Sequence, residues 1–374
     1  MRIELTEMSK RNLNFMTGQN KAPGQIVQFL KEEALVRSFS ETLRRICPGK
    51  EILGQITDVL TEASGDKREN VTRKVRNWLE DVHVPKNREI LFQICFALGA
   101  KEEDADRILG MGAENGIHYR NPKELVYAFG LRKGMGYQEA AALYRRVKNM
   151  LEDVPGDEQI HTETFTTVIR QEFQEVCSVE ELIEFFLRNR TRFGELHNTA
   201  HGIYVDLLKK LQNPETGVEE DEGKYNVDKV LENYLRMKVP NSRKTEEFTL
   251  LQRVVKKYWP NQRSIIRMKK RGEDISRKTL ILLQLVTEDF DHGDEEEFMG
   301  ALGQSVQEAA DLRLESRFVK MNLLLDRCGM SKLDPCCPFD YLVLYAMKAQ
   351  EDENMGERMN EVVKVLFSEG DCTE

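Results

Sequence analysis

Residues 71–109 read VTRKVRNWLEDVHVPKNREILFQICFALGAKEEDADRIL, and the spacing of their apolar residues indicates a run of helices. Val71, Val75 and Trp78 recur at helical spacing, and Pro85 then interrupts the pattern. Residues 90–98 form a second apolar run with the same period. The acidic residues that follow Gly99 are typical of the first turn of another helix. The stretch therefore predicts three consecutive helices joined by short connections.

The segment before this stretch predicts a further helix and a turn. Residues 52–60 are amphipathic, residues 64–66 (SGD) end that pattern, and a helix is expected over residues 68–80. On this second helix the polar side chains lie opposite the apolar side. Arg pairs with guanine, Asn with adenine, and Lys neutralises phosphate, so this face suits duplex DNA. The predicted DNA-binding residues are Arg68, Asn70, Arg73, Lys74, Arg76 and Asn77.

The order of these features resembles the second half of a Cro/repressor-type (Xre-like) helix-turn-helix domain. In that family a recognition helix is followed by a short loop that ends in Pro. A helix with the consensus sequence liaIaxaLg comes next, and then a helix that begins with acidic residues. Pro85, residues 94–99 (ICFALG) and residues 101–109 match in that order. The resemblance implies that the recognition helix is the one that carries Arg73, Lys74, Arg76 and Asn77.

The chain departs from the family pattern at two places. Residues 51–65 contain no small-residue turn between two helices, and Glu80 and Asp81 stand where many relatives have a Gly-containing loop. Residues 117–144 resemble helical extensions found beside such motifs in bacterial proteins. The resemblance thus implies a bacterial protein with an N-terminal helix-turn-helix domain.

The rest of the chain also has the helical period, and no segment alternates as a strand would. Asn121 followed by Pro122 predicts a helix start, and residues 178–181 (SVEE) form a capping box. The predicted fold is all-α, with an N-terminal helix-turn-helix domain followed by helical-bundle or helical-repeat-like domains. The predicted divisions are residues 1–37 (N-terminal segment), 38–153 (helix-turn-helix and extension), 160–213 (middle domain) and 224–374 (C-terminal domain).

A second basic stretch covers residues 253–278, with ten Lys and Arg against two acids in a chain of net charge −9. Tyr258 and Trp259 lie within it, and positive charge interleaved with aromatic rings suits single-stranded nucleic acid. An anionic protein, or the acidic segments 219–222 and 288–297 of the chain itself, would use the same charges. Because Trp259 precedes Pro260, we expect a buried, structural indole. The predicted anion or nucleic-acid patch comprises Arg253, Lys256, Lys257, Arg263, Arg267, Lys269, Lys270 and Arg271.

A third candidate lies at residues 192–201. Arg192 and His197 have a spacing that resembles the motif of HEPN-type ribonucleases, although Phe193 stands where that family prefers a polar residue. His197 and His201 also have a spacing that suits zinc, but no Glu follows His197 and no third ligand is evident. The alternative is a pair of half-buried histidines at a helix contact.

Other patterns exclude function classes. No apolar window reaches ~18 residues, so no membrane span is expected, and the first residues lack the pattern of a secretory signal. Seven cysteines without disulfide-like spacing indicate reduced thiols in the cytoplasm. No catalytic, metal or cofactor signature is recognisable, so neither enzyme activity nor a cofactor is expected.

The sequence thus predicts a cytoplasmic, sequence-specific DNA-binding transcriptional regulator. Its helical C-terminal region is expected to form a homodimer or to bind a protein partner or a small-molecule effector. The first alternative is a protein-interaction adaptor whose helix-turn-helix is degenerate. The second alternative is a HEPN-like RNA nuclease.

Overall fold

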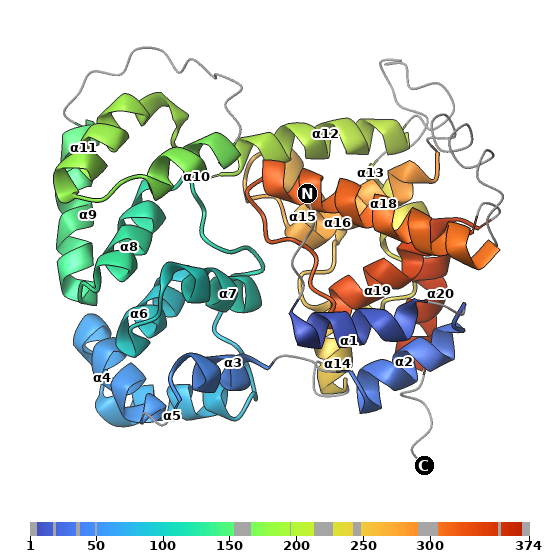
Figure 1. Ribbon diagram of the computed structural model, residues 1–374, viewed down its shortest axis with the longest axis horizontal. Coiled ribbons are helices and arrows are strands. Elements are labelled where there is room, and N and C mark those ends of the chain that lie inside the picture. The colour runs from blue at the N-terminus through green and yellow to red at the C-terminus, as the bar shows by residue number, and fades with distance from the viewer. Residues whose placement is uncertain are drawn as a thin grey trace. The chain divides into compact units, whose positions relative to one another are not determined.

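The computed structural model describes residues 6–17, 20–34, 38–48, 51–152, 166–194, 196–212, 227–241, 248–290, 306–350 and 353–368. Over these ranges every regular element is helical and no strand occurs (Figure 1). The prediction of an all-α fold is confirmed. Contacts divide the chain into two compact units: unit 1 comprises Met1–Val36, Ala200–Leu324 and Lys332–Glu374, and unit 2 comprises Arg37–Thr199 and Leu325–Ser331.

Unit 2 contains the predicted helix-turn-helix region and its extension. The first five helices are α3 (Phe39–Ile46), α4 (Ile52–Ser64), α5 (Arg68–Leu79), α6 (Arg88–Leu98) and α7 (Glu102–Ala113). They continue into α8 (Pro122–Lys133), α9 (Tyr137–Glu152), α10 (Thr166–Gln174), α11 (Val179–Arg188) and the short 3₁₀ helix η1 (Arg190–Arg192). One hydrophobic core extends from Phe39 to Phe186 and joins these helices.

Two helix starts in unit 2 follow the sequence rules that predicted them. The Asn121 side chain accepts hydrogen bonds from the backbone N–H groups of Lys123 and Glu124 at the start of α8. Ser178 and Glu181 cap each other's backbone at the start of α11. Such caps satisfy N–H groups that have no partner inside the helix, so they fix where each helix begins.

Unit 1 is built around helices that are buried on nearly all sides. Every residue of α19 (Pro338–Met347) is buried, and so are ten of the twelve residues of α16 (Arg277–Glu288). A helix that is hydrophobic all round belongs in the centre of a domain. The other described elements are α1 (Glu7–Met16), α2 (Pro23–Glu32), α12 (Asn198–Gln212), α13 (Val227–Val230), the π-helical turn η2 (Leu231–Leu235), α14 (Leu250–Lys256), α15 (Gln262–Lys269), α18 (Val306–Arg327) and α20 (Met355–Ser368).

Buried cations hold the core of unit 1 together. Arg277 donates two hydrogen bonds to the Asp340 carboxylate, at 2.8 and 2.9 Å, and both side chains are almost fully buried. Lys278 Nζ donates to the carbonyls of Val254, Val255 and Lys257 at the end of α14, where the helix itself supplies no donors. Two of the ten cations in residues 253–278 therefore stabilise the core of unit 1, and neither of them belongs to the predicted patch.

Candidate nucleic-acid interface

The connection between α4 and α5 consists of residues 65–67, as the sequence predicted from its SGD stretch. Gly65 ends α4 in the left-handed conformation, with φ of 70°, and its N–H donates to the Thr61 carbonyl. A side chain would strain this turn, so the glycine lets the chain reverse within three residues. Helix α4 packs against both α5 and α6.

Helix α5 has one buried side and one exposed side. Val71, Val75 and Trp78 are buried in the core of unit 2. The predicted contact residues lie elsewhere on the helix surface: Arg68, Asn70, Arg73, Lys74 and Arg76 are exposed, and Asn77 is half-buried. The structure thus brings these six residues onto one helix of unit 2 with most of their side chains accessible.

Two of these cations form surface ion pairs. Lys74 lies 3.3 Å from the Asp66 carboxylate, and Arg68 pairs with Asp58. All four side chains are more than half exposed. Exposed pairs of this kind contribute about 0–1 kcal/mol, so a phosphate can displace them at small cost.

The end of α5 explains one departure from the helix-turn-helix pattern. Asp81 has φ of 54°, and the N–H groups of Asp81 and Val82 donate to the carbonyls of Trp78 and Asn77. Glycine usually occupies such a left-handed helix end, and Asp tolerates it better than most residues do. Asp81 therefore adopts the backbone conformation that the Gly-containing loop would supply.

The Asp81 carboxylate also anchors α3. It accepts hydrogen bonds from the backbone N–H and the hydroxyl of Ser40, at 3.0 and 2.6 Å, in the first turn of α3. In return, Arg44 of α3 donates to the Leu79 carbonyl at the end of α5. One of the two acids that follow the predicted recognition helix is thus directed toward the protein itself.

The Arg192 and His197 pair is placed among packing contacts. Arg192 Nη1 donates to Asn189 Oδ1 at 2.9 Å and lies 3.6 Å from the Glu172 carboxylate. His197 is 4% exposed, and its ring stacks on His118 with 3.7 Å between ring centroids. His201 lies half-buried in the first turn of α12. Among the described residues no group of three His, Cys, Asp or Glu side chains is arranged to hold a metal ion.

A buried polar cluster beside this histidine pair was not predicted from the sequence. Arg88, at the start of α6, donates to both Glu124 carboxylate oxygens at 2.6 and 2.7 Å and to the Asn115 carbonyl at 3.0 Å. Glu124, which is 6% exposed, also accepts the His118 N–H at 2.8 Å. The cluster joins the helix-turn-helix region to its extension. Its members lie up to 36 residues apart in the sequence, so no local pattern connects them.

The buried histidine predicts a loss of stability in acid. Burial, together with the charges of His197, Arg88 and Arg120, holds the pKa of His118 well below its usual value. The folded chain keeps His118 neutral, whereas the unfolded chain takes up a proton below pH ~6.5. The free energy of unfolding should therefore fall between pH ~7 and ~5, by at most about 1.4 kcal/mol per pH unit for this group.

The matching experiment compares the parent with His118→Gln by urea unfolding across that pH range. The variant should show a shallower decline because its side chain takes up no proton. Burial raises the pKa of Asp106, so this group makes the free energy of unfolding rise as the pH falls. The contribution of Asp106 is common to the parent and the variant, and it cancels in the comparison. Equal pH slopes for the two proteins would rule out His118 as the cause.

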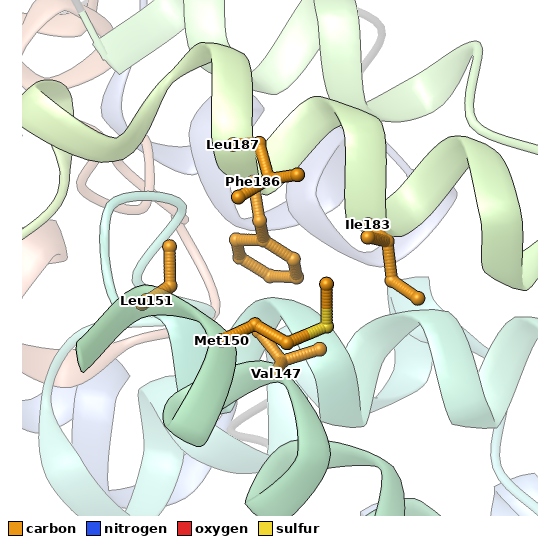
Figure 2. A pocket seen from close by; sticks show the side chains of 6 residues that line it. All are labelled: Val147, Met150, Leu151, Ile183, Phe186 and Leu187. Atoms are coloured by element: carbon orange, nitrogen blue, oxygen red, sulfur yellow. The ribbon is translucent and has the colours of Figure 1, made fainter. Parts of the chain in front are cut away.

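A small hollow in unit 2 lies between α9 and α11 (Figure 2). It leaves essentially no space for a molecule as large as water, whereas typical ligand sites measure roughly 300–1,000 Å³. Its lining side chains are all apolar: Val147, Met150, Leu151, Ile183, Phe186 and Leu187. The hollow has no polar group that would orient a substrate, so it offers no catalytic chemistry.

The second predicted patch lies in unit 1, on α14, α15 and their connections. Arg253, Arg263, Arg267, Lys269, Lys270 and Arg271 are exposed, and Lys256 and Lys257 are half-buried. Trp259 is buried, as predicted: its Nε1 donates to the Leu235 carbonyl at 2.9 Å, and its ring packs edge-on against Phe339. Of the acidic segments that the sequence offers as partners for the patch, residues 219–222 and 291–297 lie outside the described residues.

Comparison of the chain with protein-family models, curated proteins and solved structures finds no match. None of the described helices is long and apolar enough to cross a membrane. Any proposal about function therefore depends on the order of the helices and on the exposed basic side of α5.

Proposed function

We propose that the protein is a transcriptional regulator that binds duplex DNA sequence-specifically through α5. The observation that carries this proposal is the two-sidedness of α5: Val71, Val75 and Trp78 are buried, while Asn70, Arg73, Lys74 and Arg76 are exposed. The three-residue connection to α4 and the bonds between α3 and the end of α5 support it, because a reading helix must be held rigidly.

In this proposal α5 enters the major groove. Arg73 donates to the O6 and N7 atoms of guanine, and Asn70 and Asn77 pair with adenine. Lys74, Arg76 and Arg68 contact phosphates and set the register, after Lys74 and Arg68 leave their surface ion pairs. A homodimer would place two α5 helices about one helical turn apart, roughly 34 Å, on a two-fold symmetric site. The helical C-terminal region would then bind an effector or a protein partner.

The test is selection of bound duplexes from a randomised library. The parent should enrich a defined sequence, and Arg73→Ala should relax the preference at one or two positions, because a bidentate pair contributes about 1–3 kcal/mol of discrimination. Arg145→Ala is the matched control, since Arg145 is an exposed arginine on α9 of the same unit. If Arg73→Ala weakened binding equally for all sequences, base reading by Arg73 would be refuted.

A protein-binding adaptor is the second candidate. Val82, directly after α5, is 49% exposed and lies close in sequence to the exposed acid Glu80. An exposed apolar residue beside an acid suits a protein surface better than a phosphate backbone. If the protein is an adaptor, the library selection should enrich no DNA sequence. Val82→Ser should then reduce the amount of protein partner that the chain captures.

A further inference from the structure

Helix α15 and the turn after it carry a concentrated basic surface. Ile265 and Met268 are buried, and the Tyr204 hydroxyl of α12 donates to the Ile265 carbonyl at 2.9 Å, which fixes the inner side of the helix. Arg263, Arg267 and Lys270 follow at spacings of four and three residues, so they share the outer side. We define the α15 surface as the five exposed cations Arg263, Arg267, Lys269, Lys270 and Arg271.

Several charges of this surface have no acidic partner among the residues that the structure describes. Arg267 pairs with Glu273 at 3.2 Å. Within the described residues, Arg263, Lys269 and Lys270 form no ion pair. Like charges three and four residues apart on a helix repel each other. The helix dipole favours cations in the last turn, which accounts for Lys269 and Lys270 but not for Arg263.

Arg271 occupies a strained position. Its φ is 55°, and the N–H groups of Arg271 and Gly272 donate to the carbonyls of Met268 and Arg267, the pattern that ends a helix with a left-handed residue. The corresponding residues after α6 and α8 are glycines, Gly99 and Gly134. Glycine would fit this turn with less strain. Arg271 therefore places a cation in a turn whose backbone conformation favours glycine.

The aromatic residues near this surface do not offer a platform for stacked bases. Trp259 is 8% exposed, and its N–H is bonded inside unit 1. Tyr258 is half-buried, with Lys257 Nζ 5.0 Å from its ring centroid. Single-strand binding sites combine positive charge with exposed rings, whereas contact with the backbone of a duplex requires positive charge alone.

We propose that the α15 surface binds the sugar-phosphate backbone of duplex DNA without reading its sequence. The choice of duplex DNA as ligand rests on the proposed function of α5, while the contact itself depends on charge alone. Each phosphate neutralised releases counterions, so the signature of this contact is a steeper dependence of affinity on salt.

The test is fluorescence anisotropy with a labelled duplex of ~20 bp and arbitrary sequence, titrated between ~50 and ~200 mM salt. Arg263→Ala/Lys270→Ala should lower the slope of log affinity against log salt by about two, because two phosphate contacts are lost. Arg11→Ala/Lys364→Ala is the matched control, since it removes two exposed cations from α1 and α20 of the same unit. An unchanged slope in the α15 variant, or no duplex binding by the parent at ~50 mM salt, would overturn the proposal.

The two proposals fail in different ways in this assay. If Arg73→Ala/Lys74→Ala lowers the slope and the α15 variant does not, the proposed function stands and the α15 contact is refuted. If only the α15 variant lowers it, the contact stands and the role of α5 fails. Two other ligands are tested in the same assay. If the α15 surface bound a polyglutamate peptide more strongly than the duplex, its ligand would be an acidic protein. If it bound an oligothymidine strand more strongly, its ligand would be single-stranded nucleic acid, and either result would overturn the proposal.

Arg271→Gly provides a second readout. Removing the strain should raise the Tm of unit 1, and removing the charge should lower the salt slope by about one. A stabilised variant with an unchanged slope would show that Arg271 makes no phosphate contact and would count against the proposed surface.

Discussion

Asp340→Ala should destabilise unit 1 by about 3–5 kcal/mol. Arg277 and Asp340 are 7% and 3% exposed, and two hydrogen bonds join them. Asp340 also accepts the backbone N–H of Asp334 at 2.8 Å. Removing the carboxylate leaves the Arg277 guanidinium charged and buried, and the Lys332 carbonyl, which still accepts from it, carries no compensating charge. Such an uncompensated buried charge is among the most damaging single changes.

The two tryptophans allow this loss to be assigned to one unit. Trp259 lies in unit 1 and Trp78 in unit 2. In a Trp78→Phe background, Trp259 fluorescence reports the denaturant unfolding of unit 1. Glu7→Ala is the control, because Glu7 forms an exposed pair with Lys10 and its loss should cost less than about 1 kcal/mol. A similarly small loss for Asp340→Ala would mean that the buried pair does not hold unit 1 together.

Glu124→Ala should destabilise unit 2 by about 2–3 kcal/mol, somewhat less than the typical loss for a fully buried pair. Glu124 is buried and accepts from Arg88 and from the His118 N–H. Arg88, however, is 31% exposed and retains its bonds to the carbonyls of Asn115 and Gly116. Water and these carbonyls therefore compensate part of the lost pairing.

Trp78 fluorescence in a Trp259→Phe background reports this transition. Glu124→Gln is the informative comparison, because its amide oxygen can still accept a hydrogen bond while the charge is lost. We expect Glu124→Gln to be less destabilising than Glu124→Ala. If the two variants were equally destabilised, the effect would come from the ion pair alone, and if neither were destabilised, the polar cluster would not stabilise unit 2.

The sequence predicted features that depend on neighbouring residues. The period of Val71, Val75 and Trp78 identified the buried side of α5, and Asn121 and Ser178 located the starts of α8 and α11. These features are set by side chains within one or two turns of each other, so a single sequence contains the information needed.

The sequence did not predict contacts between distant segments. Asp81 follows the predicted DNA-binding helix in the sequence, yet its carboxylate bonds Ser40, 41 residues away. Arg277 and Lys278 lie within the basic stretch 253–278, yet their partners are Asp340 and the end of α14. Residues 325–331 belong to unit 2 although the chain on both sides belongs to unit 1. Such pairings depend on tertiary structure, which local periodicity does not encode.

We propose that the exposed side of α5 binds duplex DNA. The most direct measurement is fluorescence anisotropy with labelled duplex DNA at several salt concentrations, comparing the parent with Arg73→Ala/Lys74→Ala. We predict that the parent binds at ~50 mM salt, that its binding weakens as salt rises, and that the double variant binds far more weakly. Its slope should be lower by about one, because Lys74 contacts a phosphate whereas Arg73 contacts a base. Absence of binding by the parent at ~50 mM salt, or equal binding by parent and variant, would refute DNA binding through α5.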